Sequence, residues 1–136
     1  MSALPETNTL TVAEMPADCG NAPRKIVIRD FLIALYDHDA DSVLTHLDDA
    51  VEWHIIGDRV LHGHEEVAAW LATERAAAQL TIHSVITHGT DCGADGIVES
   101  ATNSKLAFSH VLIFKGHSKT APIKTLRSYS IHLPTE

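Results

Sequence analysis

Apolar residues follow two spacings along this chain, a helical one in the first half and an alternating one in the second. Between about 22 and 37, Val27, Phe31 and Leu35 recur four residues apart, which predicts a helix with one apolar face. Beyond Thr81 the period falls to two, which is typical of strands. The expected helices are 22–37, 39–49 and 65–79, and the expected strands are 50–56, 81–90, 97–102, 106–114 and 123–133.

Capping and turn residues mark the expected ends of these elements. Residues 21–23 read Asn-Ala-Pro, a capping side chain followed by a proline near the first helical position. Residues 57–58 (Gly-Asp) and 103–104 (Asn-Ser) predict short turns. The segment 91–96, rich in aspartate and glycine, predicts a longer turn.

Helices followed by a run of strands with short connections predict an α+β fold. We expect a curved antiparallel sheet that, with three N-terminal helices, encloses a conical apolar pocket. The 136 residues and 45% apolar content are enough for one core. We therefore predict a single domain over 22–136. It is preceded by a polar leader over 1–21 that could be flexible, where Pro5 and Pro16 interrupt any helix.

The charge and the cysteines limit the kinds of partner. The formal charge is -8 and the ten lysines and arginines are scattered, which argues against nucleic acid and against an anionic membrane surface. The apolar stretches fall short of a membrane span, and residues 1–20 lack the regions of a signal peptide. Two distant cysteines, Cys19 and Cys92, do not form a disulfide framework, so we predict a cytoplasmic protein.

Three segments stand out as motifs: 36–41 (YDHDAD), 50–57 (AVEWHIIG) with Gly63, and 108–129. Together they resemble the nuclear-transport-factor-2-like (NTF2-like) superfamily, above all its SnoaL-like polyketide cyclases and ketosteroid-isomerase-like proteins. Residues 36–41 (YDHDAD) are similar to the family's break between its first two helices. Residues 50–57 (AVEWHIIG), with Gly63, are similar to its first strand and crossover, and 108–129 to its last hairpin. The resemblance covers about 22–133 and implies a SnoaL-like, cystatin-like α+β barrel. That fold hosts isomerases, cyclases, dehydratases and hydrolases, and also modules without catalysis.

The ketosteroid isomerase pattern, laid over this chain, marks three positions. The family's general-base aspartate falls on His54, its oxyanion-hole aspartate on His110, and its oxyanion-hole tyrosine on Asp30. None of the family residues is kept, yet each position carries a titratable group. Scytalone dehydratase, another relative, uses a histidine in a Thr-x-His setting, and residues 81–83 are similar, so His83 is a further candidate.

The predicted catalytic residues are His54, His110 and Asp30. His110 shares a strand face with Phe108 and Leu112, where an unpaired polar group would be costly, so it needs a neighbouring side chain, a water or a ligand as partner. In the catalytic hypothesis His54 takes a proton next to a carbonyl, and His110 or Asp30 stabilises the enolate or returns the proton. The alternatives stay open: His54 as a pocket-lining or exposed residue, and Asp30 as a helix-edge carboxylate.

The predicted substrate-binding residues are Trp53, Ile56, Phe31, His83, Phe108, Leu112 and Tyr129. For Trp53 and Trp70 the favoured alternative to a substrate-binding role is apolar packing, in the core or at a dimer interface. Tyr129 could reach either the cavity or a partner subunit.

Two kinds of function fit these observations. The first is a cofactor-independent isomerase, cyclase or dehydratase that acts on a small apolar oxygenated molecule. The second is a ligand-binding or assembly module without catalysis. No cofactor motif is found, and the histidines at 54, 62 and 64 show no clear zinc geometry, so we expect neither cofactor nor metal. We also expect a homodimer through the outer sheet face, on which Val111, Ile113, Ile123 and Ile131 are predicted to lie.

Overall fold

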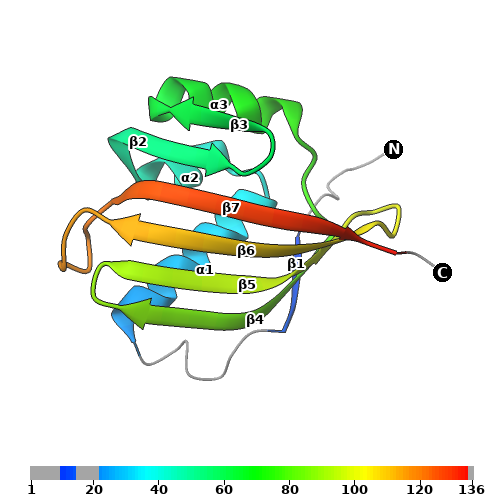
Figure 1. Ribbon diagram of the computed structural model, residues 1–136. Helices are drawn as coiled ribbons and strands as arrows, with labels where there is room; N and C mark the ends of the chain where they lie inside the picture. The colour runs from blue at the N-terminus through cyan, green and yellow to red at the C-terminus, as the bar shows by residue number, and fades with distance from the viewer. Residues whose placement is uncertain (1–9, 15–21, 135–136) are drawn as a thin grey trace, which may run out of the picture.

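The computed structural model describes residues 10–14 and 22–134 and has an α+β architecture (Figure 1). Its elements are β1 (Thr11–Glu14), α1 (Pro23–Tyr36), α2 (Ala40–Thr45), β2 (Leu47–Ile55), β3 (Arg59–His62), α3 (Gly63–Thr73), β4 (Gln79–His88), β5 (Asp91–Glu99), β6 (Lys105–Phe114) and β7 (Ile123–Leu133). The predicted fold class is therefore confirmed. Of the expected leader, residues 10–14 are described, and 11–14 form β1.

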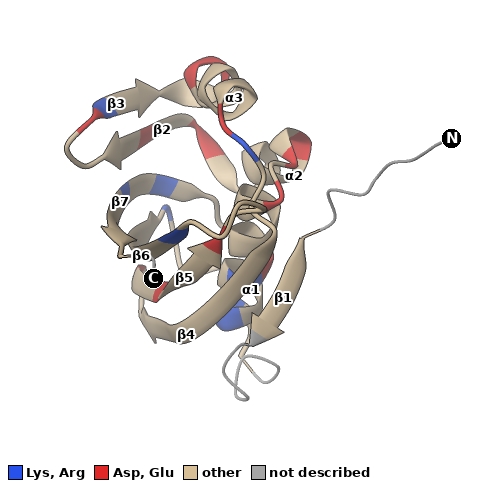
Figure 2. Cartoon of the chain, turned by 90° about the vertical axis from the view of Figure 1, so that its right-hand side faces the viewer, with Lys and Arg blue, Asp and Glu red and all other residues tan. Residues whose placement is uncertain are grey.

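All seven strands belong to one curved sheet that stays open, in the order β1-β4-β5-β6-β7-β2-β3. The expected sheet is antiparallel throughout, but two of its pairings are parallel, β1 with β4 and β2 with β7. β2 precedes the four consecutive strands β4 to β7 in the chain and lies beyond β7 in the sheet, where it runs parallel to β7. Figure 2 shows the sheet curving around α1, with α3 beside β2 and β3.

Local sequence explains where the helices begin and end. Pro23 occupies the first turn of α1, and Ala22 is the N-cap, while the expected cap Asn21 lies outside the described residues. Asp39 caps α2, accepting hydrogen bonds from the Ser42 backbone at 3.3 Å and from its hydroxyl at 2.8 Å. Both helices therefore begin close to the expected positions.

The expected long turn at 91–96 is wrong, because these residues begin β5. The hairpin bends instead at Gly89, whose φ of +61° favours glycine. Gly96 is needed for close packing: a Cβ there would overlap the Thr81 carbonyl oxygen and lie 2.9 Å from Phe108 Cζ. Gly96, one of the two glycines that indicated a turn, thus allows β4, β5 and β6 to approach one another.

Two further differences concern element ends. The third helix ends at Thr73 and not near 79, because the chain leaves it to bond elsewhere: Ala77 N–H donates to Tyr36 O at 2.9 Å and Ala78 N–H to Glu99 O at 2.8 Å. The sequence pattern also missed β3, a four-residue strand that pairs with β2.

The core lies between α1 and the concave face of the sheet. Its largest fully buried side chains include Trp53, Phe31 and Phe114. Ile123 is fully buried as well, so the expectation that it faces outward is wrong. A register shift between Ile113 and Phe114 accounts for this, since one irregular position exchanges the faces of the residues paired beyond it.

Candidate functional site

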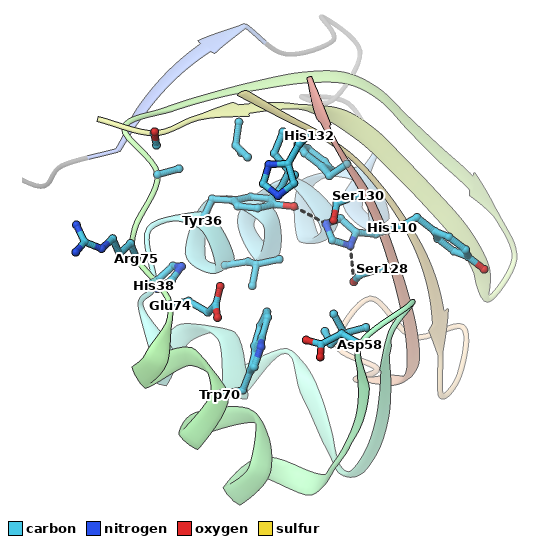
Figure 3. A pocket seen from close by; sticks show the side chains of 18 of the residues that line it. Tyr36, His38, Asp58, Trp70, Glu74, Arg75, His110, Ser128, Ser130 and His132 are labelled. Carbon is cyan, nitrogen blue, oxygen red and sulfur yellow. Dashed lines mark hydrogen bonds between the residues drawn. The ribbon is translucent and has the colours of Figure 1, made fainter. Parts of the chain in front are cut away.

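A cavity of about 690 Å³ opens at one end of the core. It lies between the C-terminal ends of α1 and α3 and the strands β2, β6 and β7 (Figure 3). Most of its wall is apolar, formed by residues such as Leu35, Trp53, Trp70, Val98 and Phe108. Such a space suits a small, largely apolar molecule.

A chain of hydrogen bonds forms the polar part of this wall. Tyr36 Oη lies 2.8 Å from His110 Nε2, and Ser128 Oγ lies 2.7 Å from His110 Nδ1 (Figure 3). Trp53 Nε1–H donates to the same Ser128 oxygen at 2.8 Å. The four residues come from four separate elements, Tyr36 from α1, Trp53 from β2, His110 from β6 and Ser128 from β7. Only the folded chain brings them together.

Burial keeps this chain of groups uncharged. His110 is only 3% exposed, and the loss of water around the imidazolium lowers its pKa to about 4. The same desolvation raises the pKa of Tyr36 far above its usual value of 10. At neutral pH the site therefore offers a neutral imidazole and a neutral phenol.

Aromatic rings hold the network in place. The Phe108 ring lies 4.9 Å from that of Tyr36 and 5.2 Å from that of His110. On the other side of the cavity the indoles of Trp53 and Trp70 meet edge to face at 5.3 Å. Packing of this kind fixes the direction of the hydrogen-bonding groups.

Charged side chains stand at the mouth of the cavity. In Figure 3 the carboxylates of Asp58 and Glu74 are directed toward the open space from opposite sides. Asp58 is held by its neighbour, since Arg59 Nε–H donates to Oδ2 at 3.1 Å, and its backbone N–H donates to Ile55 O at 2.9 Å. His38, with a left-handed φ of 58°, lies where the chain leaves α1.

The structure does not bring the three predicted catalytic residues together. His110 lies in the cavity wall, but His54 does not line it. His54 faces the outer side of β2, where its Nε2 is 2.9 Å from Glu52 Oε1. Asp30 is exposed on α1 and accepts hydrogen bonds from Arg29. The outward position of His54 follows from alternation along β2: because Trp53 turns inward, its neighbour His54 turns outward.

The predicted substrate-binding residues divide into three groups. Trp53, Ile56, Phe108 and Tyr129 line the cavity. Tyr129 does so at the rim and is 43% exposed, since it alternates with the inward-facing Ser128. Phe31 and Leu112 are fully buried in the core outside the lining. His83 is exposed at a register shift in β4, away from the cavity.

Three parts of the site are not indicated by the sequence pattern: Tyr36, Ser128 and Asp58. Tyr36 was part of the family-like segment 36–41, yet nothing in the sequence indicates that it meets His110. Ser128 precedes Tyr129 on the expected last strand, and strand alternation alone places the two residues on opposite faces. The side chain of Ser128, not of Tyr129, is the one that faces the histidine.

Among the described residues, no group of three or more His, Cys, Asp or Glu side chains is arranged to hold a metal ion. Within the same residues, no helix is long and apolar enough to cross a membrane.

Comparison with known proteins shows the fold. No protein-family model matches the chain, and no curated protein is similar to it in sequence. Solved structures do match. An NTF2-like protein of unknown function from Burkholderia xenovorans has a TM-score of 0.70 and 11% identity, over 84% of this chain and 86% of that one.

Two other similar structures carry more specific descriptions. One is a proposed ketosteroid isomerase from Kribbella flavida, with a TM-score of 0.67 and 9% identity over 84% of this chain and 82% of that one. The other is a proposed SnoaL-like polyketide cyclase from Shewanella denitrificans, with a TM-score of 0.65 and 11% identity over 79% and 90%. The chain thus has an NTF2-like fold, as the resemblance implied, and at these identities the likeness extends to the fold alone.

Proposed function

We propose that this protein binds a small, uncharged, largely apolar molecule that carries a carbonyl or hydroxyl oxygen. We further propose that it catalyses, without a cofactor, a proton transfer next to that oxygen, as an isomerase, cyclase or dehydratase would. The observation that carries the proposal is the buried chain from Tyr36 through His110 to Ser128 in the wall of an apolar cavity. The isomerase and cyclase descriptions of similar folds agree with it.

The roles follow from the protonation states. Tyr36 is the group that can donate a hydrogen bond to a carbonyl oxygen, and the mostly apolar wall of the cavity strengthens that bond. His110 has both nitrogens occupied and is neutral, so it positions Tyr36 instead of exchanging protons with the substrate. The sequence-based expectation of histidine acid–base catalysis is therefore replaced by tyrosine polarisation.

The proposed base is Asp58, at the mouth. Its carboxylate takes a proton from the carbon next to the carbonyl, the electron pair moves toward the oxygen, and Tyr36 stabilises the charge that develops there. The protonated Asp58 then returns the proton to another carbon, which completes an isomerisation with no other reactant. Glu74, directed toward the cavity from the opposite side, is the alternative base.

A second candidate function is binding without catalysis. It is favoured by the pairing of Asp58 with Arg59, which engages the proposed base. Both versions place the ligand in the same cavity, so they differ only in whether a bound ketone exchanges its protons. A cytoplasmic location is also part of the proposal, consistent with Cys92 being a free thiol.

Tryptophan fluorescence measures the binding step directly, since both tryptophans of the chain line the cavity. We expect 2-tetralone to bind more tightly than tetralin, the hydrocarbon of the same shape without the carbonyl. In Tyr36→Phe this preference should fall by roughly tenfold, the value of one hydrogen bond. Tyr129→Phe is the matched control, because it deletes the hydroxyl of a tyrosine that is 43% exposed at the rim of the cavity. This variant should keep the preference. Equal binding of ketone and hydrocarbon by the unchanged protein would refute the proposed ligand class.

Deuterium incorporation measures the proton transfer. In D2O the protein should speed exchange at the carbons next to the carbonyl of 2-tetralone, as followed by mass spectrometry. Asp58→Asn should abolish the acceleration, whereas Asp41→Asn, on the exposed side of α2, should not. Loss of exchange in Glu74→Gln but not in Asp58→Asn would assign the base to Glu74. Binding with no acceleration at all would favour the non-catalytic module.

A further inference from the structure

The hydrogen bonds around His110 can be satisfied in two ways. Trp53 Nε1–H donates to Ser128 Oγ in both, because an indole nitrogen is only a donor. In the first arrangement His110 carries its proton on Nε2 and donates to Tyr36 Oη, while the Ser128 hydroxyl donates to Nδ1. In the second the proton is on Nδ1 and is donated to Ser128 Oγ, while the Tyr36 hydroxyl donates to Nε2.

The two arrangements present different faces to the cavity. In the first, the Tyr36 hydroxyl hydrogen has no acceptor among the described residues and is free to bond to a ligand oxygen. In the second, the Tyr36 oxygen is free to accept a hydrogen bond, and the Ser128 hydroxyl hydrogen is the one left over. Both residues line the cavity, so the hydroxyl hydrogen left without an acceptor can donate a hydrogen bond to the molecule bound there. Each arrangement uses both nitrogens of His110 and differs from the other by the position of one ring proton, with no change in net charge.

We propose that His110 is a tautomeric switch that sets whether Tyr36 donates or accepts a hydrogen bond. This rests on the proposed function and adds a specificity rule to it. A ligand with a carbonyl selects the Nε2–H tautomer, and a ligand with an acidic hydroxyl, such as an enol or phenol, selects the Nδ1–H tautomer. The same cavity thus holds the keto and the hydroxyl forms of one molecule, and His110 acts as a positioning residue through Tyr36.

Burial supports a neutral switch of this kind. His110 is 3% exposed, and desolvation lowers its pKa to about 4, so the imidazolium, which would block both arrangements by leaving no ring nitrogen to accept a hydrogen bond, is unfavourable at pH 7. The phenolate of Tyr36 is unfavourable for the same reason. What remains is a choice between two neutral tautomers, each with a hydrogen-bond partner at both ends.

The test is the ¹⁵N spectrum of histidine-labelled full-length protein, in which a protonated and an unprotonated ring nitrogen resonate far apart. Without ligand, Tyr36→Phe should give the Nδ1–H tautomer and Ser128→Ala the Nε2–H tautomer. The reason is that a buried N–H without an acceptor is costlier than a buried acceptor without a donor, so the proton stays on the nitrogen that keeps its partner. Ser109→Ala, an exposed serine on β6, is the matched control and should leave the tautomer of the unchanged protein as it is.

In the unchanged protein, 2-tetralone should give Nε2–H and 2-naphthol, which mimics its enol, should give Nδ1–H. The same His110 tautomer in both variants, or with both ligands, would overturn the switch. An imidazolium signal of His110 at pH 7 would also overturn it. If neither ligand changes the tryptophan fluorescence, the proposed function fails, and the two unliganded variants still decide the switch. If either variant loses its folded backbone spectrum, the ligand pair decides it.

Discussion

At the scale of single residues, the properties of the cavity depend on His110. It is the one buried polar side chain among the residues that the structure describes. Burying a polar group there without a hydrogen-bond partner would cost several kcal/mol of stability. The hydroxyls of Tyr36 and Ser128 supply the partners and remove most of that cost. The remaining penalty applies to the protonated form, because burial removes the water that would stabilise the cation.

Stability should therefore decrease as the pH falls through the range in which only the unfolded chain binds this proton. Burial lowers the pKa of His110 from 6.5 to about 4. Above pH 6.5 neither state is protonated and the contribution is fully present. As the pH falls from 6.5 toward 4 the unfolded state gains the proton first, and about 3 kcal/mol of stability is lost. Urea unfolding at pH values from 7.5 to 4.5 measures this slope.

The comparison variant for the pH slope is His110→Gln, which keeps a polar side chain but cannot titrate. Its free energy of unfolding should depend less steeply on pH over the same range, whatever its absolute value. An identical slope in the two proteins would mean that His110 takes up its proton in the folded state as readily as in the unfolded chain.

The residue scale also shows how far a sequence can specify a site. Alternation along β6 was enough to identify His110 as a polar residue in an apolar face that needed a partner. Its partners could not be found in the same way, because Tyr36 is 74 residues away and Ser128 is 18 residues away. His54 entered through a pattern laid over β2, where a displacement by one residue exchanges the inner and outer faces.

At the scale of elements, the β4–β5 hairpin depends on the absence of a side chain at Gly96. The three strands β4, β5 and β6 meet at this point, with the Thr81 carbonyl on one side and the Phe108 ring on the other. Phe108 is also the ring that packs against His110 and Tyr36. Packing in the hairpin thus supports the site, although the hairpin contributes only a small part of the cavity wall.

Gly96→Ala should destabilise the protein by about 2–3 kcal/mol, because the new methyl group overlaps backbone that has no free space. Gly93→Ala is the matched control on the same strand, since its Cβ would lie 3.6 Å from the His110 carbonyl oxygen, an ordinary contact. Its effect should stay within about 0.5 kcal/mol. Thermal or urea unfolding of both variants checks this, and equal destabilisation would show that strand propensity, not close packing, explains the glycine.

Elements were predicted well wherever a long apolar period existed, as for α1 and for β7, whose bounds match the expectation. Composition misled at 91–96, where glycine and aspartate usually indicate a turn: here Gly96 allows close strand packing, and Asp91 is exposed at the first position of β5. The short strands β1 and β3 have too few residues to show a period. β1 pairs with β4, which is distant in the sequence. β3 pairs with β2 because the turn between them reverses the chain.

At the scale of the whole molecule, the open sheet has two unlike faces. The concave face is covered by α1 and lines the cavity, whereas the convex face has no helix of the described chain packed over it in Figures 1 and 2. That convex face carries Ile131, 68% exposed, and Ile86, 63% exposed, with Val111 and Ile113 half-buried between them. An apolar surface of this kind favours contact with another protein surface, and a symmetric pair of identical chains is the commonest such arrangement.

We propose that two chains associate through this convex face. Light scattering at micromolar concentration should then give twice the chain mass of 14.8 kDa. Ile131→Asp should shift the mass toward that of one chain, because a carboxylate opposite Ala107 would be desolvated in the interface. Ala69→Asp, which places the same charge on the exposed side of α3, should leave the dimer intact. A single-chain mass for the unchanged protein would refute the dimer. Because the cavity and its hydrogen bonds are formed within one chain, the dissociated Ile131→Asp variant should still bind the ligand.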